Sequence, residues 1–465
     1  MDQDSLPESE TGKIFEKILV DRLNEWLRMN PIYQLSDNQF GFREGKSTCD
    51  ALTRVQDAVN EAIDQDGVVV AVSLDIKNAF NSLPWPVIRE ALRRKRVPEY
   101  IRRIIDHYLR SVEYVDKKGQ RISRSMQAGV PQGSVLGPTL WNVCYDSVLQ
   151  EGANLQTALV VNRIKRLGLT VSANKTEAVL FYGRRNKPKD LPSLIVDGEI
   201  VQTRPSMKYL GVILDSKMLF REHLNYIETK VAKVTKTLGR LMPNLRGPKE
   251  RKRKLYANVI LSIILYAAPI WCDAMSTSKN RTKLDRLVRM VNIRVAAAYR
   301  TVSLEAASIM VRIPPLHLLA ALRRRVYLRV ADLRSTKQWS KIAVKEIKEE
   351  ETLIMRRQWE FHIGRPNLSG VRVREAVLPI FNQWLDGRLT FHMTQIISGH
   401  GCFGSYLFRI VMRAICLTLE AWAAFSQLCG AVMLEKESRK RERQAREAQM
   451  IAAQANGSNS QHDDD

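Results

Sequence analysis

The sequence is poor in cysteine, and its cysteines show no spacing typical of a metal site or a disulfide framework. Six cysteines are spread over 465 residues, and no two of them form a CxxC pair. Close pairs are the usual mark of a structural zinc site, and a dense set marks a small secreted domain. The pattern excludes a disulfide-stabilised secreted module and predicts reduced thiols in an intracellular protein.

Long hydrophobic runs are also missing. The longest, residues 257–271, is shorter than the roughly 20 residues that cross a bilayer, and we interpret it as one buried helix. A second apolar stretch, residues 415–434, is interrupted by Glu420 and Gln427. The first residues are acidic and polar. We therefore expect no signal peptide, no transmembrane helix and no membrane partner.

Acidic residues are scarce relative to basic ones. The chain has 49 Asp and Glu against 73 Lys and Arg, which gives a formal net charge of +24. Such an excess favours a polyanionic partner, nucleic acid first and an acidic membrane second, and charge alone does not choose between them. The hydrophobic fraction of 45% is ordinary for a globular protein.

What the sequence does contain is a carboxylate at the end of an apolar strand. Residues 68–72 read VVVAV, a run long enough for one buried strand and too short for a typical helix. Asp75 follows this predicted core strand. A carboxylate there is costly unless it is compensated, and a bound metal ion is one compensation. The alternative is an aspartate that caps the next turn.

Two loops have compositions that suit a ligand. Residues 39–48 place Arg43 and Lys46 before a helix, and backbone amides with two cations suit phosphate oxygens, although an ordinary loop is the alternative. Residues 129–138 contain three glycines and two prolines before an apolar helix. Such a loop lets the backbone approach a ligand closely.

Helical periodicity predicts a first helix from residue 12 to about residue 30. Its expected core face is formed by Ile14, Phe15, Ile18, Leu19, Leu23, Trp26 and Leu27. A later helix that ends near Lys95 carries five basic residues, Arg89, Arg93, Arg94, Lys95 and Arg96. The densest basic run is residues 249–254. Each is either a solvated face or a surface that binds nucleic acid.

Together these residues resemble reverse transcriptases. Asp75 with Phe80, followed by GVPQGSVLGP at residues 129–138, is similar to motifs A and B of those enzymes, and QFGFR at residues 39–43 resembles their fingers segment. The polymerases of insect non-LTR retrotransposons that insert into ribosomal RNA genes are the most similar class. Weaker matches follow at residues 174–177, 208–212, 265–271, 314–316, 389–395 and 399–401.

The resemblance implies roles for six residues. Asp75 would be a metal ligand and catalytic carboxylate, and Lys175 a proton donor to the leaving pyrophosphate. Arg43 would lie near the incoming triphosphate, Phe80 near its sugar, and Gln132 and Gly133 beside the templating base pair. The implied cofactor is Mg²⁺, and the implied partners are an RNA template and a DNA primer or target. The implied location is the nucleus, at the insertion site.

The sequence departs from the family at motif C. Two adjacent aspartates are expected after motif B, yet no Asp occurs between Asp146 and Asp190. The interval is also short, so we expect a deleted hairpin near residues 150–160 and a chain that does not sustain synthesis. A genuine deletion and an error in the gene model would look alike. The alternatives are a non-catalytic RNA- or DNA-binding remnant and a remnant that folds poorly.

Two further departures concern the ends of the family pattern. His400, Cys402, Cys416 and Cys429 lack the close pairs of a zinc knuckle, so we expect no zinc. The endonuclease domain and first fingers strands of such elements are also expected to be missing.

The fold class predicted is α+β, with a right-hand polymerase fold. The expected parts are a disordered lead (1–11), fingers and palm with an antiparallel sheet (12–200), a helical thumb and connection (201–330), a helical C-terminal region (331–452) and a disordered tail (453–465).

Overall fold

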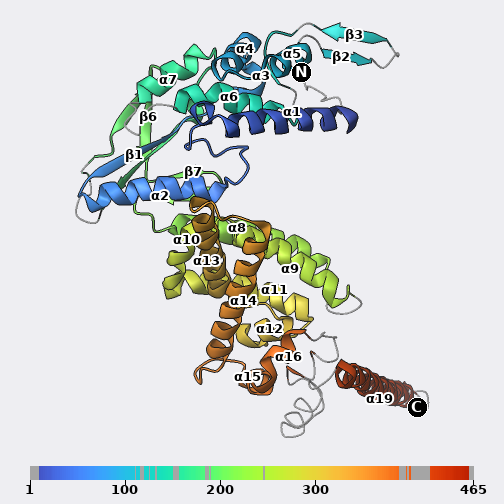
Figure 1. The fold of residues 1–465 in the computed structure, drawn as a ribbon. Helices are drawn as coiled ribbons and strands as arrows, with labels where there is room; N and C mark the ends of the chain where they lie inside the picture. Colours follow the sequence, from blue (N-terminus) through green and yellow to red (C-terminus); the bar gives the residue numbers. More distant parts are fainter. Residues whose placement is uncertain are drawn as a thin grey trace. The chain divides into compact units, whose positions relative to one another are not determined.

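A computed structural model describes most of the chain. The described residues are 10–109, 112–115, 120–124, 126–130, 133–149, 157–183, 188, 190–243, 247–386, 394, 397–398 and 419–459. Contacts divide the chain into two compact units, Met1–Glu222 and His223–Asp465 (Figure 1).

The first unit combines helices with a small sheet. Its helices are α1 (Glu10–Met29), α2 (Thr48–Asp64), α3 (Ala79–Ser82), α4 (Trp85–Arg94), α5 (Glu99–Tyr108), α6 (Gly137–Leu149) and α7 (Thr157–Arg166). Its strands are β1 (Val68–Ser73), β2 (Val112–Val115), β3 (Arg121–Arg124), β4 (Glu177–Tyr182), β5 (Ser193–Val196), β6 (Glu199–Arg204), β7 (Ser206–Tyr209) and β8 (Val212–Asp215).

The sheet has the strand order β1-β4-β6-β5, with β1 antiparallel to β4 and β4 parallel to β6. Two separate hairpins are formed by β2 with β3 and by β7 with β8. Helix α2 packs along β1 and β4 (Figure 1). The main core cluster gathers buried side chains of α1, α4, α5, α6 and α7 with residues of β4, β5 and β6. The expected mixture of helices with a sheet is therefore present, but the prediction of an antiparallel sheet is wrong for the β4–β6 pair, which is parallel.

Strand β1 differs from the buried core strand that its composition predicts. It stands at the end of the strand order, and none of its six residues is fully buried. The reason is that β4 is its one pairing partner among the described residues, so its other edge has no neighbour there.

The first turns of α1 also differ from the prediction. Leu19, Leu23 and Leu27 are buried as expected, whereas Ile14, Phe15 and Ile18 are exposed. Glu16 is buried in their place, because its carboxylate caps another helix, as described below. The periodic apolar pattern therefore predicted the wrong inward face for this part of the helix.

The second unit is helical. After α8 (Arg221–Arg240), which begins at the boundary, it contains α9 (Glu250–Ile264), α10 (Ala268–Trp271), α11 (Ser278–Ala296), α12 (Leu304–Val311), α13 (Leu316–Ser335), α14 (Lys341–Ile363), α15 (Val371–Val377), α16 (Phe381–Asp386) and α19 (Leu419–Asn459). The predicted single helix over residues 257–271 is wrong. Helix α9 ends at Ile264 and Ala267 has φ +49°, because Pro269 has no N–H to donate to the Leu265 carbonyl and its ring would clash with that carbonyl in a continuous helix. Helix α19 continues to Asn459, past the expected start of the disordered tail, because its Ala- and Gln-rich end favours helix.

Among the described residues, no single helix is both long and apolar enough to cross a bilayer. Two bent helix pairs, at residues 250–276 and 304–335, meet the requirement for length and apolar composition only when their members are joined across a break.

Candidate functional site

Asp75 lies two residues beyond the end of β1, in a segment bonded to the strand-like residues before β4. The Ser172 N–H donates to the Asp75 carbonyl at 2.7 Å, and the Lys77 N–H donates to the Thr170 carbonyl at 2.9 Å. The antiparallel register of β1 and β4, with Ser73 opposite Glu177, continues these contacts. One strand pair therefore joins positions that are about a hundred residues apart in the chain.

This register brings two of the predicted site residues together. The Lys175 Nζ lies 3.6 Å from the Asp75 Oδ2, with side-chain exposures of 75% and 44%. An ion pair so exposed contributes little to stability, typically about 0–1 kcal/mol. Both groups can therefore rearrange toward a ligand at small cost.

The residues near Asp75 do not fit two magnesium ions. A Mg²⁺ site in a polymerase is built from several carboxylates together with substrate phosphates. In the described part of the chain, no group of three or more His, Cys, Asp or Glu could hold a metal ion, and the charged neighbour of Asp75 is an ammonium. Asp146, the next Asp after motif B begins, is buried inside α6 in a different network.

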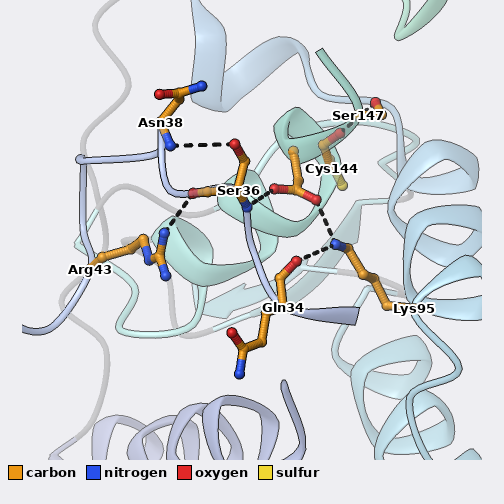
Figure 2. A network of polar contacts seen from close by, with 8 residues as sticks. Gln34, Ser36, Asn38, Arg43, Lys95, Cys144 and Ser147 are labelled. Carbon is orange, nitrogen blue, oxygen red and sulfur yellow. Dashed lines mark hydrogen bonds and ion pairs between the residues drawn. The ribbon is translucent and has the colours of Figure 1, made fainter. Parts of the chain in front are cut away.

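That network attaches the loop of residues 34–43 to α6 (Figure 2). Asp146 is 0% exposed; its Oδ1 accepts from the Ser36 N–H at 2.6 Å and its Oδ2 pairs with the Lys95 Nζ at 2.5 Å. The Lys95 ammonium also donates to the Gln34 carbonyl at 3.1 Å. A buried charge pair with such hydrogen bonds holds the start of the loop against the helix.

A second buried side chain holds the other end of the loop. Asn142, one helical turn before Asp146, donates from its Nδ2 to the Gly41 carbonyl at 2.9 Å and accepts at its Oδ1 from the Gln39 Nε2 at 2.5 Å. The Arg43 guanidinium donates to the Ser36 carbonyl at 2.6 Å, which closes the loop on itself. Arg43, predicted to lie near a triphosphate, therefore uses part of its donor set within its own loop.

Four aromatic rings run from this loop to α6. The Phe42 ring meets the Phe80 ring edge-on at 5.8 Å between centroids, and Phe80 lies 5.3 Å from Trp141. Trp141 in turn stacks with Tyr145 at 5.5 Å. Phe42 is 67% exposed, whereas the other three rings are half-buried. Phe80 thus stands between the anchored loop and the helix.

The glycine-rich loop is bonded to the segment that follows Phe80. The Gly129 N–H donates to the Leu83 carbonyl at 2.8 Å, and the Val130 N–H donates to the Phe80 carbonyl at 2.9 Å. Gly129 has φ +92°, and a Cβ there would lie 2.8 Å from the Asn81 carbonyl oxygen, so only glycine fits. Gly133 has φ +91° and open space around it. Gln132 lies outside the described residues.

A residue that the sequence patterns missed anchors this loop to α6. The Glu16 carboxylate accepts hydrogen bonds from the Val135 N–H at 2.6 Å, the Leu136 N–H at 3.2 Å and the Ser134 hydroxyl at 3.1 Å. A carboxylate at the N-terminus of a helix satisfies unpaired amides and complements the helix dipole. The sequence has no local signal for this role, because the same helix also contains Asp21 and Glu25, which are exposed.

Part of the predicted basic surface is internal. Lys95 is buried against Asp146, and Arg89 pairs with Asp106. Within the basic run of residues 249–254, Arg253 is buried and its guanidinium donates to the Arg294 carbonyl at 2.6 Å, while burial lowers its pKa. Arg251 and Lys252 are exposed. The expectation that these runs act as whole surfaces is therefore wrong for Lys95 and Arg253.

Comparison with known families covers the part of the chain that contains these loops. A family described as "Reverse transcriptase (RNA-dependent DNA polymerase)" matches residues 7–156. The predicted resemblance is confirmed. The match includes Asp75 and both loops but ends before Lys175.

Curated relatives point to the same class of mobile element. The chain is 28% identical over 331 residues to the retrovirus-related Pol polyprotein of the R1 element of Bradysia coprophila, covering 64% of this chain and 32% of the relative. It is 28% identical to a probable RNA-directed DNA polymerase from transposon BS of Drosophila melanogaster, covering 59% and 34%. It is 25% identical to the polymerase of mobile element jockey of Drosophila funebris, covering 59% and 33%. The matches thus span about a third of the relatives' length.

A solved telomerase structure from Candida albicans, in complex with a fragment of telomeric RNA, matches 73% of this chain and 56% of its own with 12% identity. Its TM-score of 0.29 is too low to support a conclusion about the fold.

The positions expected for a zinc knuckle cannot be compared with the structure: His400, Cys402 and Cys416 lie outside the described residues.

Proposed function

We propose that this chain is a reverse transcriptase-type protein of a non-LTR retrotransposon that binds RNA or DNA but does not sustain RNA-directed DNA synthesis. The observation that supports this most directly is the match over residues 7–156 combined with a site in which Asp75 is paired with Lys175. By family, Asp75 and Lys175 are the catalytic positions, with Asp75 as metal ligand and with Arg43, Phe80, Gln132 and Gly133 facing the nucleotide and template.

The parts proposed for a right-hand polymerase are fingers and palm at residues 12–200, a helical thumb and connection at 201–330, and a helical C-terminal region at 331–452. One edge of β1 has no strand partner among the described residues, which supports the proposal that a palm hairpin is missing. A strand made of five apolar residues and one serine suits the middle of a sheet, whereas natural edge strands are usually protected by charges, prolines or bulges. The adjacent aspartates of motif C would lie on such a hairpin.

The expected loss of synthesis follows from the carboxylates that are missing around the metal ions. Polymerases use two metal ions to stabilise the attacking and leaving oxygens of the phosphoryl transfer. Mg²⁺ remains the cofactor expected by family, but this chain offers one of the carboxylates that would hold it. Removing charge stabilisation of that kind costs several kcal/mol of barrier, or about a hundredfold in rate for each 3 kcal/mol lost.

Primer extension tests the catalytic half of the proposal. The full chain is incubated with an RNA template, a DNA primer, deoxynucleotides and either Mg²⁺ or Mn²⁺, beside a known reverse transcriptase as a positive control. No incorporation above background is expected. Incorporation that disappears in an Asp75→Ala variant would show that the site works and would overturn the proposal.

A salt titration tests the binding half. Contacts with single-strand phosphates give a slope of log K against log salt of about −0.7 for each phosphate neutralised. Replacing exposed Arg251 and Lys252 by alanine should make the slope less steep, by the amount that one or two such phosphate contacts contribute. Replacing both residues of the buried Lys95–Asp146 pair should leave the slope unchanged. A slope near zero for the wild-type chain would contradict nucleic-acid binding through the basic surface.

The alternative is an active polymerase, which requires that an error in the gene model removed the hairpin from this sequence. Sequencing the genomic DNA and the transcript across codons 150–170 is the direct check, because an intact reading frame for an Asp-Asp hairpin would restore the enzyme. Action in the nucleus at the insertion site stays a prediction for either form.

A further inference from the structure

An exposed aromatic ring is held in place beside the candidate site. Phe42 is 67% exposed, and its backbone has φ +53°, a left-handed conformation that is uncommon and unfavourable for residues other than glycine. An exposed phenylalanine gains nothing from burial that would offset this cost. Strained backbone geometry of this kind persists where the surrounding structure imposes it, and it occurs most often at binding and active sites.

The surrounding structure does impose it. The Gly41 carbonyl, next to Phe42, accepts from the buried Asn142 amide, and the buried Asp146 carboxylate fixes the Ser36 amide at the other end of the loop. The Phe42 ring itself touches Phe80 edge-on. The ring is therefore preorganised, so that the protein loses little conformational entropy when a ligand stacks on it.

The neighbouring charges select the kind of ligand. Lys46 lies over the Phe40 ring at 5.4 Å in the same loop, and Arg43 follows Phe42 directly. Lys77, three residues before Phe80, is exposed, and Lys175 is 75% exposed beside Asp75. Phe42 thus lies on a loop with two cations, one of which, Lys46, is 3.8 Å from the Asp37 carboxylate, and its ring contacts Phe80 of a segment that carries exposed Lys77. An apolar ring on such basic segments suits a single nucleic-acid strand, whose bases stack on aromatics while its phosphates meet lysine and arginine.

We propose that Phe42 is a nucleobase-stacking residue for single-stranded RNA or DNA. This rests on the proposed function, since it names the part of the nucleic acid that this loop would contact. A paired base has its faces covered by its neighbours, so the strand that binds must be single there. The Phe80 ring contacts Phe42, and Trp141 and Tyr145 continue this row of rings; all three are half-buried, whereas Phe42 is exposed.

The test separates base contacts from phosphate contacts. Binding of the full chain is measured by fluorescence anisotropy at one fixed salt concentration, with two labelled strands of equal length. One is oligo(U), and the other carries abasic sites and therefore has phosphates without bases. The variants are Phe42→Ala, Phe42→Trp and, as the matched control, Phe361→Ala, which removes an equally exposed phenylalanine (72%) in the helical unit.

The wild-type chain is expected to bind oligo(U) more tightly than the abasic strand. Phe42→Ala should weaken oligo(U) binding by about 5- to 150-fold, leave abasic binding unchanged, and be rescued by Phe42→Trp. Phe361→Ala should change neither. With 5-iodouridine in the strand, irradiation should cross-link the peptide that contains Phe42.

Four results would overturn the inference. Equal binding of the two strands by the wild-type chain, or an unchanged oligo(U) affinity in Phe42→Ala, would mean that no base stacks on this ring while leaving the proposed nucleic-acid binding intact. An equal loss for both strands in Phe42→Ala would mean that the ring supports the loop alone or meets an apolar partner. Failure of the wild-type chain to bind either strand would refute the proposed function as well.

Discussion

Asp146 and Lys95 offer the sharpest test of how α6 holds the loop of residues 34–43. Asp146→Ala leaves the Lys95 ammonium, itself almost fully buried, without its counter-charge, and leaves the Ser36 N–H without its acceptor. Removing one partner of a buried ion pair typically costs about 3–5 kcal/mol. That is a large part of the about 5–15 kcal/mol that holds a domain folded. Lys95→Met should cost a similar amount, because the buried Asp146 carboxylate then loses its counter-charge.

The double variant Lys95→Met/Asp146→Leu separates charge burial from packing. It removes both charges. The Ser36 N–H then lacks its acceptor, which costs about 1–3 kcal/mol, and the carbonyl of exposed Gln34 loses the Lys95 donor. We therefore expect the double variant to be more stable than either single variant. The control is Asp21→Ala, which breaks the exposed Lys17–Asp21 pair at 2.8 Å on α1 and should cost no more than about 0.5 kcal/mol.

The assay is hydrogen exchange followed by mass spectrometry at increasing urea concentration. Peptides of α6 report the free energy of unfolding of the first unit, and the peptide with Ser36 reports local opening of the loop. The reasoning is refuted if Asp146→Ala costs no more than Asp21→Ala, or if the two single losses add up in the double variant.

Three further expectations concern single residues. Glu16→Ala should destabilise the first unit by about 1–3 kcal/mol, because the amides that it caps are left buried, whereas exposed Glu25→Ala on the same helix should be nearly neutral in the same exchange assay. Gly129→Ala should cost clearly more than Gly133→Ala; both have φ near +91°, so the difference in urea midpoint isolates the clash at the first. Burial lowers the pKa of His223 from 6.5 to about 4, so that as pH falls the unfolded chain takes up the proton before the folded chain does. The free energy of unfolding of the helical unit should therefore fall by about 3 kcal/mol between pH 6.5 and pH 4. His223→Gln should remove this pH dependence, as measured by urea titrations at several pH values.

The positions of the secondary structure elements followed from local patterns. Apolar spacing located α1, and the run of valines located β1, because each signal lies within one element. The break at Ala267 had a local signal too, in Pro269, which cannot donate to the Leu265 carbonyl in a continuous helix. Reading the apolar run by hydrophobicity alone hid that signal.

Long-range electrostatics could not be predicted in the same way. Glu16, Lys95 and Arg253 stand in helical stretches where a charged residue normally faces water. Each is buried because its partner comes from a distant segment: backbone amides at the start of α6, Asp146, or the Arg294 carbonyl. A single sequence contains no local trace of such pairing. For the same reason, the anchoring of the Phe42 loop by Asn142 emerges only from the structure.

Two independent observations bear on what Asp75 can do. The first is compositional: no Asp occurs between Asp146 and Asp190, the interval in which the resemblance predicts two adjacent aspartates. The second is topological: β1 has the composition of a central strand, yet among the described residues it has a neighbour on one edge only. Loss of one hairpin accounts for both, because that hairpin would supply the aspartates and pair with the open edge. If it was lost from the gene, β1 is an unprotected apolar edge, and the chain should aggregate more readily than a chain with an Asp-Asp hairpin restored at residues 150–160.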